Sequence, residues 1–128
     1  MAERPYYHFS VLDENCPSRE LLTLIADKWT ALVIEVLMCG EMRYTELKQQ
    51  VAGISDKMLS QTLHKLVEKQ IVERRVYPTV PPQVEYQLTE SGQSLSEPLH
   101  ALVVWAERNQ ALLMNVHSQH DAKTNEKA

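Results

Sequence analysis

The sequence predicts a mainly helical α+β domain that contains one small β-ribbon. Apolar side chains recur at helical spacing in four segments before residue 70, and again in a long segment that begins near residue 91. Between them, residues 71–78 and 83–89 alternate and are rich in β-branched and aromatic side chains. The expected order is therefore four helices, two antiparallel strands and a final helix.

Residues that favour helix ends mark most of these boundaries. The first helix is expected in CPSRELLTLIAD, with Pro17 at its first position, and the second in KWTALVIEVLMCG, which Gly40 ends. A short third helix is expected in MRYTELKQQVAG with Thr45 as its N-cap. Ser55 is expected to cap the fourth helix, and Pro98 to mark a break or a start in the last one.

The third and fourth helices are joined by a segment that contains glycine, and the ribbon follows them. Two such helices and a β-ribbon make a winged helix-turn-helix. The ribbon's connection, PTVPP, is too stiff and too long for a tight turn. Helices before and after this unit are expected to form the dimerisation surface of the protein.

Length and composition fit one domain, with 128 residues of which 44% are hydrophobic. We expect an N-terminal arm over residues 1–15, the domain over residues 16–114, and a flexible tail over residues 115–128. The apolar runs are too short to span a membrane, and the N-terminus has no apolar signal core. A cytoplasmic protein without membrane contact is therefore expected.

The net charge of −4 disfavours a nucleic-acid partner, but the charge is unevenly distributed. Between residues 41 and 79, seven basic residues against five acidic ones leave a net charge of +2. The rest of the chain has six basic residues against twelve acidic ones. A mildly basic centre between acidic flanks allows DNA binding through one face.

No enzyme, metal or cofactor site is expected. The sequence contains no serine–histidine–acid set, phosphate loop or metal motif. His117, His120 and Asp121 have ligand-like helical spacing but lie in a polar segment, where a solvated helix end is the expectation. Cys16 and Cys39 are too few for a disulfide scaffold, so reduced thiols are expected.

Several short motifs lie along residues 16 to 114. They are CP at 16–17, DKW at 27–29, G-x-x-R-Y-x-E-L at 40–47, GISDKMLSQTLHKL at 53–66, VPPQVEYQLTESG at 80–92, and Trp105. This set resembles the HxlR-type transcriptional regulators, a branch near the MarR-like winged-helix group. The resemblance implies a dimeric bacterial DNA-binding regulator, often a repressor and sometimes an activator. It also implies that a cysteine matching Cys16 responds to electrophiles or oxidants in some members.

The fourth helix is the predicted recognition helix, because the DNA major groove admits one α-helix whose N-terminal residues meet base edges. The residues expected to contact DNA are Ser55, Lys57, Ser60, Gln61, Thr62, His64 and Lys65. Ser60, Gln61 and Thr62 are expected to read bases, and the lysines and Ser55 to bind phosphates. Many members of the family resembled carry a basic residue where Thr62 or His64 stands, so phosphate contacts and sequence choice are expected to differ. The alternative is an ordinary solvated helix face.

The ribbon is the predicted wing, in which Arg74 and Arg75 point to opposite sides of one strand. One arginine is expected to face the DNA backbone while the other covers the domain, and the stiff tip loses little entropy on docking. The wing and backbone contacts expected are Arg43, Arg74, Arg75, Tyr77 and Thr79. The alternatives are a plain charged hairpin whose prolines block edge pairing, and an Arg43 that pairs with a neighbouring glutamate.

Cys16 is the predicted redox-sensing residue. It stands at the start of a helix, where the helix dipole stabilises a thiolate, and Arg19 would add positive charge. The alternative is a small, partly buried residue at a helix entry. Cys39, at a helix C-terminus, is expected to be structural.

Apolar residues of the arm and the last helix exceed what one small core absorbs, so a homodimer is expected. The predicted interface consists of Tyr6, Tyr7, Phe9, Leu99, Leu102, Val103, Ala106 and Leu113. Trp29 and Trp105 are expected to pack in the core. A two-fold dimer would present two recognition helices about 34 Å apart to a palindromic operator.

The sequence thus predicts a homodimeric, sequence-specific transcription regulator, with repression as the expected outcome and double-stranded DNA as its partner. One alternative is a winged-helix protein-interaction module that never binds DNA, which the acidic total charge favours. The other is a regulator switched by a bound small molecule instead of thiol chemistry.

Overall fold

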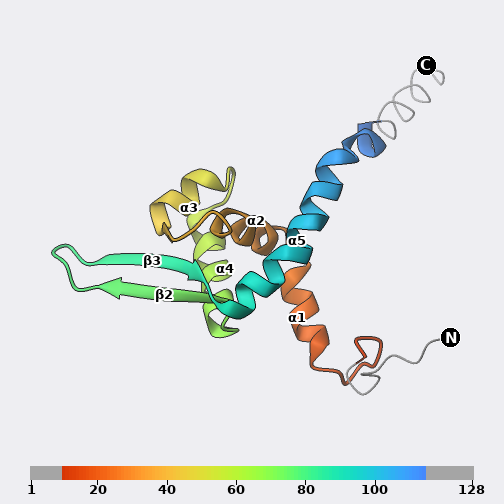
Figure 1. The fold of residues 1–128 in the computed structure, drawn as a ribbon, viewed down its shortest axis with the longest axis horizontal. Helices are drawn as coiled ribbons and strands as arrows, with labels where there is room; N and C mark the ends of the chain where they lie inside the picture. The colour runs from red at the N-terminus through yellow and green to blue at the C-terminus, as the bar shows by residue number, and fades with distance from the viewer. Residues whose placement is uncertain (1–9, 115–128) are drawn as a thin grey trace.

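The computed structural model describes residues 10–114 (Figure 1). The predicted arm and tail, including Tyr6, Tyr7, Phe9, His117, His120 and Asp121, lie mostly or wholly outside these residues. The elements are α1 (Ser18–Ile25), α2 (Lys28–Leu37), β1 (Met42–Arg43), α3 (Tyr44–Gln50), α4 (Asp56–Glu68), β2 (Val72–Tyr77), β3 (Gln83–Leu88) and α5 (Glu90–Arg108).

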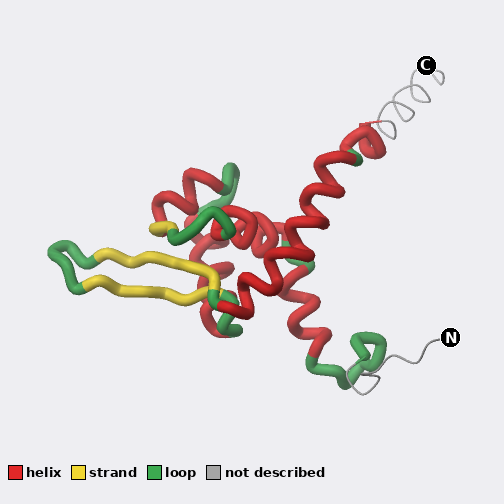
Figure 2. The backbone as a smooth tube through the Cα atoms, in the orientation of Figure 1, coloured by secondary structure: helices red, strands yellow, loops and turns green. Residues whose placement is uncertain are grey.

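The strands form one antiparallel sheet in the order β1–β3–β2. The hairpin of β2 and β3 is paired from Val72 with Leu88 to Tyr77 with Gln83, and it projects away from the helices (Figures 1 and 2). This confirms the predicted ribbon. The strand β1 was not predicted; it pairs with the middle of β3 and so attaches the start of α3 to the hairpin.

One hydrophobic core joins the helices to the base of the sheet. Its buried residues are Val33, Ile34, Leu37, Leu47, Val51, Ile54, Leu59, Leu63, Leu66, Ile71, Val72 and Leu99. These residues belong to α2, α3, α4, β2 and α5, and to the loops that precede α4 and β2. The core therefore holds α3 and α4 at a fixed angle and anchors the near end of the hairpin.

The predicted N-cap residue was correct for α4, whereas the starts of α1 and α3 differ from the prediction. The Ser55 hydroxyl accepts a hydrogen bond from the Met58 amide at 3.1 Å, as an N-cap does. Pro17 is the N-cap residue of α1 and not its first helical residue. Thr45 lies inside α3, whose N-cap residue is Arg43, because β1 runs directly into the helix.

The last helix, α5, is continuous, so the expected break at Pro98 was wrong. Proline removes the N–H that would bond the carbonyl of Ser94, one turn earlier. Pro98 and Ser94 are both exposed, so water can bond that carbonyl in its place. After a turn at Asn109, residues 110–114 are helical again.

Candidate nucleic-acid interface

The helices α3 and α4 form the helix-turn-helix pair. Between them, Gly53 adopts a φ of +86°, a left-handed conformation that suits glycine, and Ile54 turns back into the core. Ser55 then starts α4, and the carboxylate of Asp56 lies at the positive end of that helix. This turn presents the N-terminal half of α4 on the surface.

The outward face of α4 is polar and free of large apolar groups. Lys57, Ser60, Gln61, His64 and Lys65 are all exposed, as predicted. The last four line one open hollow on the surface of the helix. Hydroxyl, amide, imidazole and ammonium groups therefore share one face.

Thr62 does not belong to this face, and its predicted role in base reading was wrong. Its side chain is only 4% exposed, and it lies with Leu59, Leu63 and Leu66 on the inner side of α4. Positions 59, 62, 63 and 66 are spaced three or four residues apart, which places them on one stripe. The helical period already carried this signal in the sequence.

A polar cluster that was not predicted joins α3 to the start of α4. The Tyr44 hydroxyl lies 3.0 Å from Oδ1 of Asp56 and 3.3 Å from Oγ of Ser60. The other carboxylate oxygen of Asp56 pairs with Nζ of Lys48 at 2.7 Å. Hydrogen bonds from Lys48 and then from Tyr44 lower the pKa of Asp56. The cluster fixes the angle between the two helices and neutralises a carboxylate on the surface of α4.

The two arginines of β2 lie on opposite faces of the hairpin. Arg74 pairs across the strands with Tyr86, and both line a hollow of about 220 Å³ with Tyr44, Ser60 and His64. This hollow separates α4 from the hairpin. Arg74 therefore lies on the same side of the molecule as the exposed face of α4.

Arg75 lies on the other face, among acidic neighbours. Its Nε is 3.4 Å from Oε1 of Glu73, and its strand partner is Glu85. A hydrogen bond with Tyr77 and the charge of Glu73 raise the pKa of Arg75. Arg75 therefore lies on the face of the hairpin away from α4, and its partners are residues of the sheet.

The remaining predicted wing residues are engaged within the sheet and its tip. Nη2 of Arg43 donates to Oε1 of Gln83 at 2.8 Å, which ties β1 to the far part of β3. The Arg43 amide donates to Oε1 of Glu46 at 3.3 Å. Thr79 donates its hydroxyl to the carbonyl of Pro81 at 2.8 Å, while Tyr77 is half-buried.

An acidic pair accompanies Arg75 on its face of the sheet. Hydrogen bonding between Glu41 and Glu85 raises the pKa of Glu41, and the charge of Arg75 partly opposes this shift. This face therefore has a mixed charge, whereas Arg74 lines the hollow beside α4 without an acidic neighbour in that lining. The face of the hairpin with Arg74 is therefore better suited to an anionic partner than the face with Arg75.

Cys16 is a free thiol and only 6% exposed. It precedes Pro17, the N-cap residue of α1. The Arg19 guanidinium donates to the carbonyls of Val11 and Leu12 at 2.9 and 3.0 Å, so it holds the segment before Cys16. Cys39 is a free, exposed thiol after α2, and its structural role stays a prediction beside the alternative of a second reactive thiol.

The predicted dimer residues fall into two groups within the described part of the chain. Leu99 is 5% exposed and belongs to the core, so its assignment to an interface was wrong. Leu102 and Leu113 are 63% and 68% exposed, Ala106 is exposed and Val103 is half-buried. Trp105 is 60% exposed, which corrects its expected place in the core, whereas Trp29 packs against the core as predicted. The end of α5 thus presents an uncovered apolar face.

The profile of the HxlR-like helix-turn-helix family matches residues 24–113. The chain belongs to this family. The match covers α2 to α5 and contains both helices of the helix-turn-helix pair and the whole hairpin. The HxlR-like family is one of DNA-binding transcriptional regulators and not of enzymes, so the chain is a helix-turn-helix transcriptional regulator.

Similar proteins of known sequence or structure agree with this assignment. The HTH-type transcriptional regulator YtfH of Escherichia coli is 38% identical over 109 residues, which are 85% of this chain and 86% of YtfH. The solved structure of the regulator ytfH from Salmonella typhimurium has a TM-score of 0.78 and 36% identity, over 85% of this chain and 97% of that one. The structure of diamide-treated YodB from Bacillus subtilis has a TM-score of 0.64 and 36% identity, over 75% and 96%.

No helix among residues 10–114 is both long enough and apolar enough to cross a membrane. No group of three or more histidine, cysteine, aspartate or glutamate side chains in that range could hold a metal ion.

Proposed function

We propose that the chain is a sequence-specific repressor that binds a palindromic operator as a homodimer. The observation that carries this proposal is the exposed polar face of α4 beside Arg74 of the hairpin. A helix of this width fits the major groove, where Gln61 can bond adenine and Ser60 can bond other base edges. Lys57, Lys65 and Arg74 then bind the phosphates on either side.

The homodimer is supported by the apolar end of α5. Leu102 and Trp105 lie three residues apart on one helix and are both mostly exposed. Leu112, Leu113 and Met114 extend this exposed surface. A second copy of the chain that covers it by two-fold symmetry brings two α4 helices to successive major grooves.

Charge reversal on the two faces of the hairpin tests DNA binding. Lys57→Glu with Arg74→Glu is expected to abolish binding to DNA from the chain's own genomic neighbourhood, measured by fluorescence anisotropy at several salt concentrations. Wild-type affinity should fall steeply with salt, because bound lysines and arginines displace counterions. Lys57→Glu with Arg75→Glu is the matched control, and it should retain more of the binding.

The outcomes separate the proposal from its rival. Equal losses in both double variants would contradict the assignment of Arg74 to the DNA side. Failure of the wild-type protein to bind any such DNA, together with loss of a protein partner in the variants, would identify a protein-interaction module.

Thiol sensing through Cys16 is the second candidate function. It is supported by the likeness to YodB, whose structure has been solved after treatment with the thiol oxidant diamide. The burial of Cys16 implies that an oxidant reaches the thiol when the segment around residues 10–16 opens. Cys16→Ser is expected to bind DNA as the wild type does but to lose the response to diamide, whereas Cys39→Ser should keep it. A response that survives in Cys16→Ser excludes this role.

A further inference from the structure

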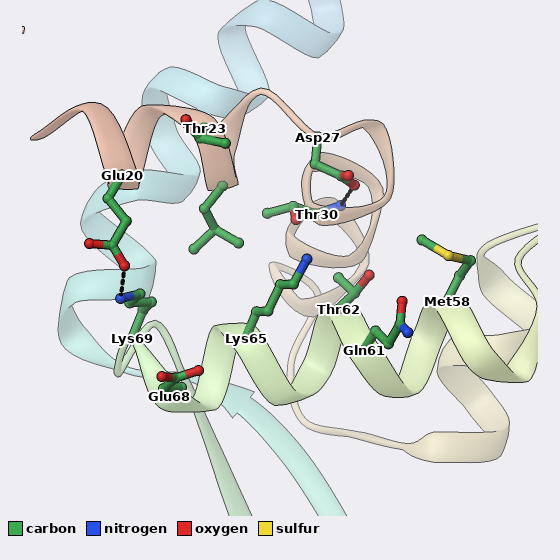
Figure 3. Close-up of a pocket in the computed structure, with 11 residues that line it drawn as sticks. Glu20, Thr23, Asp27, Thr30, Met58, Gln61, Thr62, Lys65, Glu68 and Lys69 are labelled. Carbon is green, nitrogen blue, oxygen red and sulfur yellow. Dashed lines mark hydrogen bonds and ion pairs between the residues drawn. The ribbon is translucent and has the colours of Figure 1, made fainter. Parts of the chain in front are cut away.

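A cleft of about 360 Å³ lies between α1 and α4, on the flank of the proposed recognition helix (Figure 3). Small-molecule sites in proteins typically measure roughly 300–1,000 Å³. Thr23 and Leu24 of α1, Thr30 of α2, and Met58 and Thr62 of α4 line this cleft. Methyl groups, a leucine and a thioether therefore form walls suited to an apolar molecule.

Two of the three carboxylates that line the cleft already have partners. Glu20 of α1 forms an ion pair with Lys69, which spans from α1 to the end of α4 (Figure 3). Oδ1 of Asp27 accepts hydrogen bonds from the amides of Trp29 and Thr30 at 2.8 and 3.2 Å and so caps α2. Glu68, at the C-terminal end of α4, also contributes to the lining.

Lys65 differs from Lys69 in having no ion pair or side-chain hydrogen bond with any residue between 10 and 114. Figure 3 shows its amino end pointing from α4 into the cleft, toward Thr30. An ammonium group that stands without a counterion beside apolar walls suits a ligand with one negative charge.

We propose that this cleft binds a small organic monoanion, whose apolar body lies against Leu24 and Met58 and whose acidic group binds the Lys65 ammonium. Gln61 and Lys65 line both the cleft and the open hollow on the outward face of α4. A bound anion therefore withdraws Lys65 from DNA phosphates and weakens operator binding. This last step rests on the proposed DNA-binding function, whereas ligand binding itself does not.

Calorimetry and amide NMR spectra of the full chain with 2-naphthoate test the site. One molecule is expected to bind per chain and to shift the amides of α1, Asp27 and α4. The uncharged 2-naphthol and the cationic 2-naphthylmethylamine should bind at least about tenfold more weakly, because they lack the charge-assisted bond. Lys65→Met is expected to lose 2-naphthoate binding, and Lys57→Met, a lysine of the same helix outside the cleft, to retain it.

A variant that fills the cleft links the site to DNA. Thr23 is exposed on α1 and outside the proposed DNA surface, so Thr23→Trp is expected to bind DNA normally but to bind no 2-naphthoate. In the wild type, saturating 2-naphthoate should weaken DNA binding by about tenfold, since one phosphate contact is worth about that much at low salt. Thr23→Trp should not respond, and Ser94→Trp, an exposed site on α5, should respond as the wild type does.

Two results would overturn the proposal. One is binding of 2-naphthoate that Lys65→Met and Thr23→Trp leave unchanged, with shifts near Trp105 and Leu113 at the apolar end of α5. The other is tighter binding of the cationic probe. If the protein binds no DNA but binds 2-naphthoate through Lys65, the proposed function fails and the ligand site stands.

Discussion

Gly92, in the first turn of α5, lies against the backbone that joins α4 to β2. A Cβ atom at this position would lie 2.1 Å from the Ile71 carbonyl oxygen. That oxygen also accepts the Thr89 amide at 3.0 Å and the Thr89 hydroxyl at 3.1 Å. Withdrawal of the carbonyl would therefore weaken the contact that starts α5.

We expect Gly92→Ala to lower the free energy of unfolding by about 1–3 kcal/mol, as overpacking commonly does. Urea denaturation of the full chain measures this value. Ser94→Ala, two residues later and exposed, should change it little. Equal stability of Gly92→Ala and the wild type would show that the contact is loose.

Gln70 ends α4 with a φ of +60°, a left-handed conformation that side chains with a Cβ rarely adopt. Its amide bonds the Val67 carbonyl at 3.0 Å, and the Ile71 amide bonds the Leu66 carbonyl at 2.9 Å, the pair of bonds that closes a Schellman motif. Gln70→Gly should raise the free energy of unfolding by about 1 kcal/mol, because glycine avoids the left-handed penalty.

Thermal and urea unfolding measure the effect of Gln70→Gly. Gln70→Ala keeps a Cβ atom and is the control, expected to match the wild type. A less stable glycine variant would mean that the gain in unfolded-state entropy exceeds the relief of backbone strain.

The orientation of single side chains was predicted best where the helical period of the sequence decides which face they lie on. Lys57, Gln61 and Lys65 were correctly placed on the outside of α4, and Ser55 at its N-cap. The polar character of Thr62 favoured an outward side chain, whereas its position in the apolar stripe of α4 places it inside. The roles of Arg74 and Arg75 could not be separated, because alternation shows that they diverge but not which face of the hairpin lies beside α4.

At the scale of elements, the contact between α3 and α4 depends on the ionised form of Asp56. Its pKa lies below the ordinary value in the folded chain, so its contribution to stability is complete above the unfolded pKa. That contribution is lost as the pH falls through the folded pKa, below about 4.

Asp56→Asn is therefore expected to be less stable than the wild type at pH 7, and the difference should vanish in stronger acid. Urea denaturation across pH 2–7 follows it. Asp13→Asn, in the exposed turn before α1, is the control and should show no comparable trend. A difference that persists at the lowest pH would assign the effect to the amide itself and not to the lost charge.

The longer elements were predicted from the sequence and the shortest was not. The hairpin strands carry clear alternation over six residues each, and α4 carries a cap and an apolar stripe. A two-residue strand such as β1 has no period to detect, and its pairing with Tyr86 and Glu85 depends on how the core places α3. The predicted break at Pro98 was wrong because the carbonyl that loses its partner there is exposed to water. The sequence alone does not show that exposure.

At the scale of the whole molecule, the proposed homodimer depends on the exposed apolar end of α5. We expect Leu102→Glu with Trp105→Glu to shift the proposed dimer to a monomer, since two charges would then have to be buried in the interface. Sedimentation equilibrium measures the mass, and circular dichroism should show an unchanged fold because both side chains are mostly exposed.

Val80→Glu serves as the control for assembly, because Val80 is a fully exposed apolar residue at the hairpin tip. It should leave the mass unchanged. A wild-type protein that sediments as a monomer at high concentration would contradict the proposed homodimer directly.

The uninterrupted course of α5 has a mechanical consequence. Its 19 residues span about 28 Å, from the Thr89 cap at the root of the hairpin to the turn beyond the exposed Leu102 and Trp105. With no hinge along this length, the helix behaves as a lever. A small change in the angle between two copies at their interface would displace each hairpin tip by a larger distance. The distance between the two hairpins on the DNA would therefore depend on the interface, which lies at the end of the molecule farthest from the DNA.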